Sequence, residues 1–402
     1  MQLYNKFVSV IYEYFRLLVI ANPIPERNIL RMIILIFILM SLVGFLLFKD
    51  VRLKQTEIQV SDSKWKASVI IPARNEQENL PSLLESLKRQ TVQPYEIIVV
   101  DDFSEDHTAE IAAQYGVKVI HNTQLPENWT GKTWAVWNGY RASSGNVLVF
   151  LDTDVRLAPY ALAVLLQERE QSGGAISVVP FHNPGRFYEK LSLIPCLLGV
   201  FAFTSPFERR SNRKGLYGSC ILASREDYEK ISGHSSIRSE ILDDLNLGRR
   251  FSEAGIPVQN YLGGDLVSFR MYPGGILSEL QGFSKGAILS TATLRPGTIF
   301  CVALWLVGIF VTGLFTPFLL LSGHPWAMPF AIGYLIYAIQ LFYFLRFTGR
   351  YGLWMPFLHV LSSIFFLTVL LYSAYQVNFV GSVSWKGRQV SVSDKSTPRK
   401  SE

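Results

Sequence analysis

The sequence is short of charged side chains and of cysteine. Only 17% of its 402 residues are charged, whereas 49% are hydrophobic. This balance is typical of membrane proteins. The three cysteines, Cys196, Cys220 and Cys301, lack the spacing of metal ligands. They fit a reducing compartment or simple burial, and Cys220 has no nearby His or Lys that would activate it as a nucleophile.

Charge is absent altogether from three long stretches. Residues 32–48 are just long enough to cross a bilayer as a helix. They lie far from the start of the sequence, and no small-residue cleavage site follows, which favours a retained anchor over a signal sequence. A second stretch, 298–345, is broken into two helix lengths at Pro325, and a third runs from Leu353 to Tyr375. We therefore expect one membrane helix before the globular part and about three after it.

Lysine and arginine near the ends of a span mark its cytoplasmic side. Arg346 and Arg350 lie between the last two predicted spans, whereas the turn around Gly323 has no charge. This distribution predicts that the turn faces outward and the globular domain lies in the cytoplasm of a multi-pass cell-membrane protein. The basic tail, 377–402, would then lie outside, against the rule, unless one apolar segment is re-entrant.

Features of nucleic-acid binding are also missing. The net charge of +6 comes from basic residues beside apolar stretches, as expected at an anionic membrane surface. No motif that mixes aromatic and basic residues in the manner of nucleic-acid binders occurs. Two further segments are candidates for lying on the membrane: residues 7–20, and residues 191–207, which are equally compatible with a buried core helix.

The globular region alternates strand and helix patterns. Apolar strand patterns occupy residues 68–72, 96–100, 117–121 and 146–151, and helical periodicity follows the first of them, for example at Leu80, Leu83, Leu84 and Leu87. Asn75 is a candidate cap for that helix. Short connections between alternating elements predict an α/β domain with a parallel sheet covered on both faces.

Acidic residues follow the strands, at the edge where open parallel sheets bind ligands. Asp152 and Asp154 come directly after strand 146–151, and two carboxylates at this spacing suit Mg²⁺ or Mn²⁺ completed by the phosphates of a nucleotide diphosphate. Alternatively, Asp154 caps the helix that begins near Pro159. Asp243 and Asp244 open another helix, where acidic side chains are also favoured simply by the helix dipole.

Four motifs in register make a resemblance specific. They are SVIIPARNEQENL, VVDDFSEDHT, WTGKTWAVWNG and FLDTDV. In this order and spacing the chain resembles the inverting family 2 glycosyltransferases of GT-A fold over about residues 67–270. LPENWTGKTWA, DTDVRLAP, YGSCILASREDYEKISGH and EILDDLNLGRRF resemble more narrowly the membrane-anchored branch that glycosylates carotenoid acids or accompanies hopanoid synthesis.

The resemblance divides the chain into four parts. It implies an N-terminal interfacial segment and membrane anchor at 1–66, a GT-A glycosyltransferase domain at 67–297, C-terminal transmembrane helices at 298–376 and a polar basic tail at 377–402.

The resemblance also assigns roles to individual residues. It implies that the nucleotide pocket and its base contact are formed by Pro72, Ala73, Arg74, Glu76 and Asp102. A carboxylate suits the N–H of a base, typically uracil, because charge-assisted hydrogen bonds are strong. Lys132 would reach the ribose or diphosphate, unless it is a solvated lysine at a helix start. Asp152 would contact the sugar or ribose as well as the metal, and Asp154 the metal.

On the acceptor side the resemblance implies a segment at Gly218, Ser219 and Cys220, whereas Trp129 either stacks on a sugar or fills the core. The family's acidic pair maps onto Asp243 and Asp244, with Asp243 in place of the usual glutamate. Asp244 would be the general base. If the acceptor is itself a carboxylate, the base has little to remove, and Asp244 would mainly position it.

One family signature is absent. The processive motif Gln-x-x-Arg-Trp is missing, which argues against a polysaccharide synthase. In its approximate place stand residues 269–272, of which Arg270 could still face the diphosphate, and residues 281–285.

The sequence thus predicts a metal-dependent membrane enzyme that moves one sugar from a nucleotide donor, expected to be UDP-linked, to a lipid-soluble acceptor. A carotenoid acid is the leading candidate for the acceptor, and polyprenyl phosphate and diacylglycerol are the alternatives. The alternative from a different class of protein is a non-catalytic membrane scaffold or transporter that binds nucleotide. The predicted spans contain no Asp, Glu, Lys or Arg that would mark an ion path, which argues against a transporter.

Overall fold

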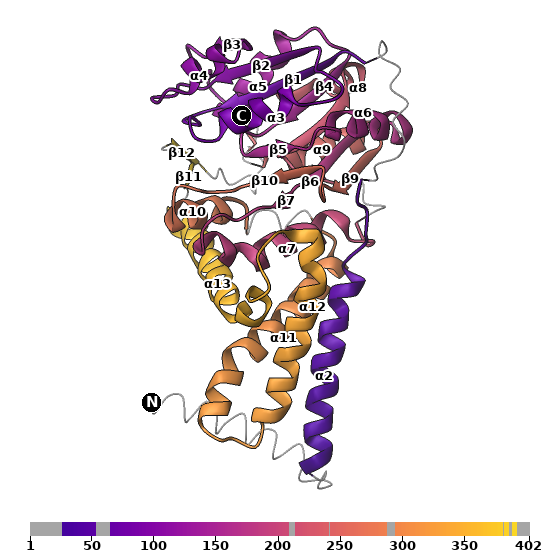
Figure 1. Ribbon diagram of the computed structural model, residues 1–402, viewed down its shortest axis with the longest axis vertical. Coiled ribbons are helices and arrows are strands. Elements are labelled where there is room, and N and C mark those ends of the chain that lie inside the picture. Colours follow the sequence, from indigo (N-terminus) through magenta and orange to yellow (C-terminus); the bar gives the residue numbers. More distant parts are fainter. Residues whose placement is uncertain are drawn as a thin grey trace, which may run out of the picture.

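The computed structural model describes residues 26–53, 65–208, 214–240, 242–287, 294–380, 382–385 and 388–391. An α/β domain lies at one end of an elongated molecule, and a bundle of helices extends from it (Figure 1). The proposed interfacial segment at 7–20, and most of the basic tail, lie outside the described residues.

The first half of the main sheet is parallel. Its strands are β1 (Ala67–Ala73), β2 (Glu96–Asp101), β3 (Lys118–His121) and β4 (Val147–Leu151), in the spatial order β3-β2-β1-β4. Nearly every side chain of β1 and β4 is buried, as expected for strands covered on both faces. The predicted strands and their parallel pairing are confirmed.

Helices connect these strands: α3 (Leu80–Lys88), α4 (Thr108–Gln114) and α5 (Gly131–Arg141). The four periodic leucines of α3 are its buried residues, as predicted. The predicted cap is wrong, because Asn79 stands at the N-cap and Asn75 lies in the preceding loop with φ 52°. There Asn75 Oδ1 accepts a hydrogen bond from the Glu105 N–H at 2.8 Å, so it fastens two loops together instead.

The second half of the sheet is mixed. β8 (Cys220–Ser224) pairs antiparallel with both β4 and β6 (Ala175–Val179), and β9 (Val258–Leu262) is parallel to β6 at the edge. The predicted parallel pairing thus holds for the four strands from which it was inferred, and β8 adds an antiparallel strand whose direction its burial pattern could not indicate. The complete seven-stranded order, β3-β2-β1-β4-β8-β6-β9, is that of a GT-A domain.

Smaller elements complete this domain. A second sheet has the order β5-β10-β7 and consists of β5 (Val155–Leu157), β10 (Val267–Phe269) and β7 (Phe181–His182). The remaining helices of the domain are α6 (Ala161–Ser172), α8 (Arg225–Lys230) and α9 (Asp243–Glu253), with 3₁₀ turns η1 (Tyr188–Ser192) and η2 (Gly233–Ile237).

Within the described residues, four helices are long and apolar enough to cross a membrane, one before the α/β domain and three after it, as predicted. They are α2 (Glu26–Leu46), α11 (Pro296–Leu321), α12 (Ala327–Thr348) and a continuous segment from η4 (Met355–Leu358) through α13 (His359–Tyr375) and η5 (Gln376–Val380). Trp305 Nε1 donates to Gln340 Oε1 at 2.8 Å, and Gln340 Nε2 donates to the Ser41 carbonyl at 2.6 Å. This buried chain links α2, α11 and α12.

Two helices separate the sheet from the bundle. α7 (Leu193–Thr204) and α10 (Ile276–Ala287) lie crosswise between the domain and the long helices (Figure 1). One face of α7, including Leu197, Val200 and Phe201, is fully buried against the bundle helices. The apolar segment 191–207 therefore contains a buried core helix, which was one of the two alternatives. The arginines that follow this segment lie outside the described residues.

The α/β domain is fastened to the bundle at two places. Residues 51–53, which follow α2, pair with the edge strand β9. The Leu53 N–H donates to the Leu262 carbonyl at 3.2 Å. The loop after α12 is held by β7, where the Arg350 N–H donates to the His182 carbonyl at 2.8 Å and the Tyr351 hydroxyl bonds His182 Nδ1 at 2.9 Å. These contacts fix the position of the α/β domain relative to the helix bundle.

The last apolar segment begins and ends against the α/β domain. Tyr351, before it, bonds His182, and Ser373 Oγ, near its end, donates to the Ser284 carbonyl of α10 at 2.7 Å. Between these points the chain dips into the bundle, where His359 stacks on Tyr334 of α12. Figure 1 shows α13 beside the end of α11 and α12 that is nearer the domain.

Candidate active site

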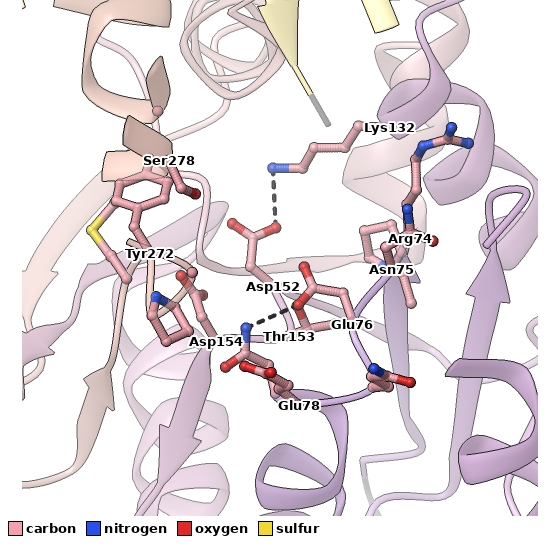
Figure 2. Close-up of a pocket in the computed structure, with 18 of the residues that line it drawn as sticks. Arg74, Asn75, Glu76, Glu78, Lys132, Asp152, Thr153, Asp154, Tyr272 and Ser278 are labelled. Atoms are coloured by element: carbon pink, nitrogen blue, oxygen red, sulfur yellow. Dashed lines mark hydrogen bonds and ion pairs between the residues drawn. The ribbon is translucent and has the colours of Figure 1, made fainter. Parts of the chain in front are cut away.

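A polar cavity of about 500 Å³ opens at the carboxyl ends of β1, β2 and β4. Sheet topology brings the strand-end residues together there, as the position of ligand sites in open α/β sheets predicts. The predicted site residues among its lining are Pro72, Ala73, Arg74, Glu76, Asp102, Lys132, Asp152, Asp154 and Ser219. Figure 2 shows Lys132 and Asp152 pointing toward one another inside it.

One wall of the cavity is built from the loop after β1. Arg74 Nη1 donates to the carbonyls of Asp102 and Phe103 at 2.8 and 3.1 Å. Glu76 Oε2 accepts from Asn79 Nδ2 at 3.0 Å. These bonds tie the loops after β1 and β2 into one wall, and they leave this wall rich in groups that can hydrogen-bond a base and a ribose.

The Asp102 carboxylate is held by a buried polar chain that sequence reasoning missed. Asn122 Nδ2 donates to Asp102 Oδ1 at 3.2 Å, and Asn138 Nδ2 donates to Asn122 Oδ1 at 2.8 Å. Asn122 follows β3 and Asn138 lies on α5, and no spacing in the sequence connects either residue to Asp102. The chain fixes the orientation of a nearly fully buried carboxylate.

Lys132 is the hub of the site. Its Nζ lies 3.1 Å from Asp152 Oδ1, 3.6 Å from Asp244 Oδ2 and 3.8 Å from Asp243 Oδ2, and its side chain is only 17% exposed. Burial opposes the charge of Lys132, but the three carboxylates outweigh it and hold the pKa of this lysine well above the usual range. The alternative of a solvated lysine is therefore wrong.

The two aspartates after β4 have separate positions. The Asp152 N–H donates to the Ser219 carbonyl at 3.0 Å, and the Asp154 carbonyl accepts from the Arg270 N–H at 3.2 Å. α6 begins at Ala161, and its N-cap, Tyr160, makes no side-chain capping bond. Asp154 thus does not cap this helix, and both carboxylates line the cavity.

The acidic pair begins α9. Asp243 is buried, whereas the Asp244 side chain remains 22% exposed beside Lys132. Burial and the neighbouring charge of Asp243 raise the pKa of Asp244 to about 7. Gly218 is needed here, because a Cβ at that position would lie 1.8 Å from Asp244 Oδ2.

A second lysine lines the same cavity and was not assigned a role from the sequence. Lys285 comes from α10, and burial lowers its pKa while the charge of Asp243 opposes this change. It lies in the segment that replaces the processive signature, and that replacement was the only available signal. Two cations and the carboxylates of Asp152, Asp243 and Asp244 thus meet where the two halves of the domain adjoin.

Six predicted site residues are not among the lining residues of the polar cavity. Asp243 and Asp244 contact Lys132, and Gly218 packs against Asp244, whereas Arg270, Trp129 and Cys220 lie elsewhere. Arg270 forms a 2.7 Å ion pair with the fully buried Glu189 and is not among the lining residues. Trp129, two residues before α5, packs edge-on against Trp134 at 5.0 Å, in an aromatic row that continues along α5 and is also outside the lining. Cys220 is fully buried, and burial raises the pKa of its thiol to about 12, in agreement with the filler interpretation.

The mixed α/β sheet, with its carboxylate-lined cavity at the strand ends, agrees with the sugar transferase that the resemblance predicts. The sequence of residues 68–232 matches the family described as Glycosyl transferase family 2. The chain is 34% identical to 4,4'-diaponeurosporenoate glycosyltransferase of Staphylococcus haemolyticus over 81% of this chain and 88% of that protein. It is 32% identical to the enzyme of the same name from Staphylococcus aureus, over 90% of this chain and 98% of that protein. The chain belongs to glycosyl transferase family 2.

Solved structures include more distant neighbours. The mannosyltransferase PcManGT from Pyrobaculum calidifontis, in complex with GDP-Man and Mn²⁺, is 14% identical with a TM-score of 0.48, over 86% of this chain and 99% of that chain. Glucosyl-3-phosphoglycerate synthase from Mycobacterium tuberculosis, in complex with Mn²⁺, UDP and glucosyl-3-phosphoglycerate, is 22% identical with a TM-score of 0.38, over 59% of this chain and 85% of that chain.

Proposed function

We propose that this glycosyltransferase moves a single hexose from UDP-hexose to the carboxyl group of a carotenoid acid, with inversion at the anomeric carbon. The observation that carries the proposal is the meeting of Asp152, Lys132 and Asp244 at one cavity beside membrane-type helices. The names of the staphylococcal relatives support the acceptor class, since those enzymes are named for a carotenoid acid.

In this proposal the wall at β1 and β2 binds the nucleotide. The Asp102 carboxylate accepts the base N–H, and Arg74 and Glu76 line the pocket around it. The orientation of Asp102 by Asn122 supports this role, because a preoriented acceptor loses less entropy on binding. Lys132 lies deeper, where its charge meets the diphosphate or the transferring sugar.

Asp152 and Asp154 are the residues that would hold a divalent metal. Within the part of the chain that the structure describes, no group of three His, Cys, Asp or Glu side chains forms a complete metal site. Two carboxylates in a cavity of this volume nevertheless suit Mg²⁺ or Mn²⁺, which takes its remaining ligands from phosphate and water. When bound, the ion would stabilise negative charge on the departing diphosphate.

The acceptor chemistry gives Asp244 its role. The bond between the anomeric carbon and the diphosphate oxygen breaks, its electron pair leaves with UDP, and an oxygen of the acceptor carboxylate attacks from the opposite face. A carboxylic acid ionises in water before it reaches the site, so no proton must be removed in the transfer. Asp244 then positions the acceptor, and with a hydroxyl acceptor it would take the proton as general base.

We further propose that the catalytic domain and the C-terminal tail both lie on the cytoplasmic side, with the last apolar segment re-entrant. The placement of Tyr351 and Ser373 against the α/β domain supports this topology. It also places the basic residues on either side of that segment on one side of the membrane, as the positive-inside rule requires.

Transfer itself can be tested with the detergent-purified protein, Mn²⁺, a panel of UDP-sugars and extracted isoprenoid acids. We expect release of UDP and a lipid heavier by one sugar. Chelation of the metal or the substitution Asp154→Ala should abolish the product, and Asp244→Asn should lower kcat. Nucleotide binding without a glycosylated acid would contradict the proposal, and a product on polyprenyl phosphate or diacylglycerol would correct the acceptor.

A further inference from the structure

We infer that a second, apolar cavity between the α/β domain and the membrane helices holds the hydrocarbon tail of the acceptor, with its carboxylate directed at Lys285 and Lys132. This inference rests on the proposed function, because it assigns a binding site to the acceptor of that transfer. The cavity measures about 420 Å³ and is separate from the polar cavity described above.

Most of the lining of the apolar cavity comes from four helices. α7 contributes Leu198, Gly199 and Phe203, α10 contributes Phe283 and Ala287, α11 contributes Ile299, Val302, Ala303 and Leu306, and α13 contributes Phe366, Val369 and Leu370. Hydrocarbon therefore dominates the lining, as expected for a site that binds an apolar ligand. Two of these helices, α11 and α13, belong to the apolar segments that could lie in a membrane, so the cavity borders helices that would contact lipid.

The apolar cavity adjoins the reacting groups through two elements. Leu245 lines it, and Asp244, the preceding residue on α9, lies 3.6 Å from Lys132 in the polar cavity. Phe283 lines it from α10, and Lys285, two residues later on the same helix, lines the polar cavity. A ligand with its tail among the apolar side chains would thus extend its head toward the sugar-transfer site.

Charge selects an anionic head. Lys132 and Lys285 both line the polar cavity, and both come from helices of the catalytic domain. Lys285 comes from α10, the helix whose Phe283 lines the apolar cavity. An acceptor carboxylate could form charge-assisted bonds with these two ammonium groups, while a neutral head group would gain no comparable bond.

Two substitutions on one helix form a matched test. Ala303→Phe adds a ring to a residue that lines the cavity, and Val307→Phe adds a ring one turn later, at a residue that is 52% exposed and outside the lining. With the full-length protein we expect Ala303→Phe to raise KM for a long isoprenoid acid at least tenfold and to leave the affinity for UDP unchanged. Val307→Phe should match the unmodified protein. Gly199→Phe, on α7, should repeat the effect of Ala303→Phe.

The head group is tested by binding rather than turnover. A fluorescent polyene carboxylic acid and its methyl ester are titrated into the protein without nucleotide. We expect Lys285→Gln to weaken binding of the acid but not of the ester, and Ala303→Phe to weaken both.

The outcomes separate this inference from the proposed function. Equal KM and equal polyene binding in Ala303→Phe and Val307→Phe would overturn the assignment of the cavity while transfer by the unmodified protein still supported the function. Polyene binding that responds as expected, in a protein that transfers sugar to no acid, would retain the lipid site and contradict the function.

Discussion

Lys132 holds a network of carboxylates that would otherwise repel one another. Asp152, Asp243 and Asp244 all lie within 4 Å of its Nζ. Such an arrangement is costly to bury, and it is typical of sites where charge must be balanced for catalysis. The residue scale therefore offers two predictions about stability, one for the lysine and one for a carboxylate.

The first concerns Lys132→Met. Removing the cation leaves three neighbouring carboxylates uncompensated, so we expect the free energy of unfolding to fall by about 3 kcal/mol, the cost of breaking a buried ion pair. Thermal melting of the detergent-solubilised protein measures this change. Lys230→Met removes an exposed lysine whose ion pairs, within the described residues, are with Glu226 and Asp227 of its own helix, and it should leave the melting temperature nearly unchanged. Similar melting temperatures for both variants would contradict the hub role.

The second concerns Asp244→Asn and its dependence on pH. The pKa of Asp244 is about 7 in the folded protein, above its value in an unfolded chain. Between these two pKa values the folded protein keeps a proton that the unfolded chain releases, so stability falls as pH rises toward 7. Asparagine removes that loss. We expect the variant to melt above the unmodified protein at pH 8, with a gain of at most about 4 kcal/mol, and to match it near pH 4. A gain independent of pH would refute the assignment.

At the scale of elements, close helix contact depends on small residues. A Cβ added at Gly308 of α11 would lie 2.0 Å from the Tyr337 hydroxyl of α12, and one added at Gly44 of α2 would lie 2.7 Å from Trp305 Nε1. Small residues at such crossings let helix backbones approach where no hydrophobic effect drives association.

Gly308→Leu should therefore destabilise the bundle by about 1–3 kcal/mol through overpacking. Gly297→Leu is the matched control on the same helix, because a Cβ there meets nothing within 4 Å. Melting temperatures in one detergent compare the two variants. Helix propensity favours leucine over glycine at both positions, so it cannot explain a loss. If Gly297→Leu lowered the melting temperature as much as Gly308→Leu, the overlap with Tyr337 would not be the cause.

At the scale of the whole molecule, the attachments of the bundle to the domain decide topology. Residues 51–53 pair with β9, and the loop after α12 is hydrogen-bonded to β7. α13 returns to α10 rather than continuing away from the domain, as Figure 1 shows. The catalytic cavity is thus held at a fixed position relative to the helices that would deliver a lipid.

This arrangement predicts the sidedness of the tail. Ser384→Cys, in β11 (Ser382–Trp385), should react with a membrane-impermeant thiol reagent from the same side as the catalytic domain. Ser322→Cys, in the turn between α11 and α12, should react only from the opposite side. The unmodified protein, with its own three cysteines, supplies the background. Labelling of both variants from one side would contradict the re-entrant segment.

The sequence by itself determined the local elements and the kind of chemistry. Burial patterns identified β1 to β4, the leucines of α3 and the apolar helices, because periodicity and hydrophobic length are properties of neighbouring residues. The motifs also placed Asp152, Asp244 and Lys132 among the candidate site residues, since strand ends of a parallel sheet meet at one edge.

Only the tertiary structure decided which distant residues meet. β8 pairs antiparallel with β4, and Asn122 donates a hydrogen bond to Asp102. Glu189 pairs with Arg270, and Lys285 lines the polar cavity. Each of these features depends on contacts between segments far apart in the chain. The apolar cavity also depends on the tertiary structure, because most of its lining comes from four helices that are far apart in the chain. Composition and spacing report what a segment can bury, whereas the choice of partner is fixed by the packing of the whole chain.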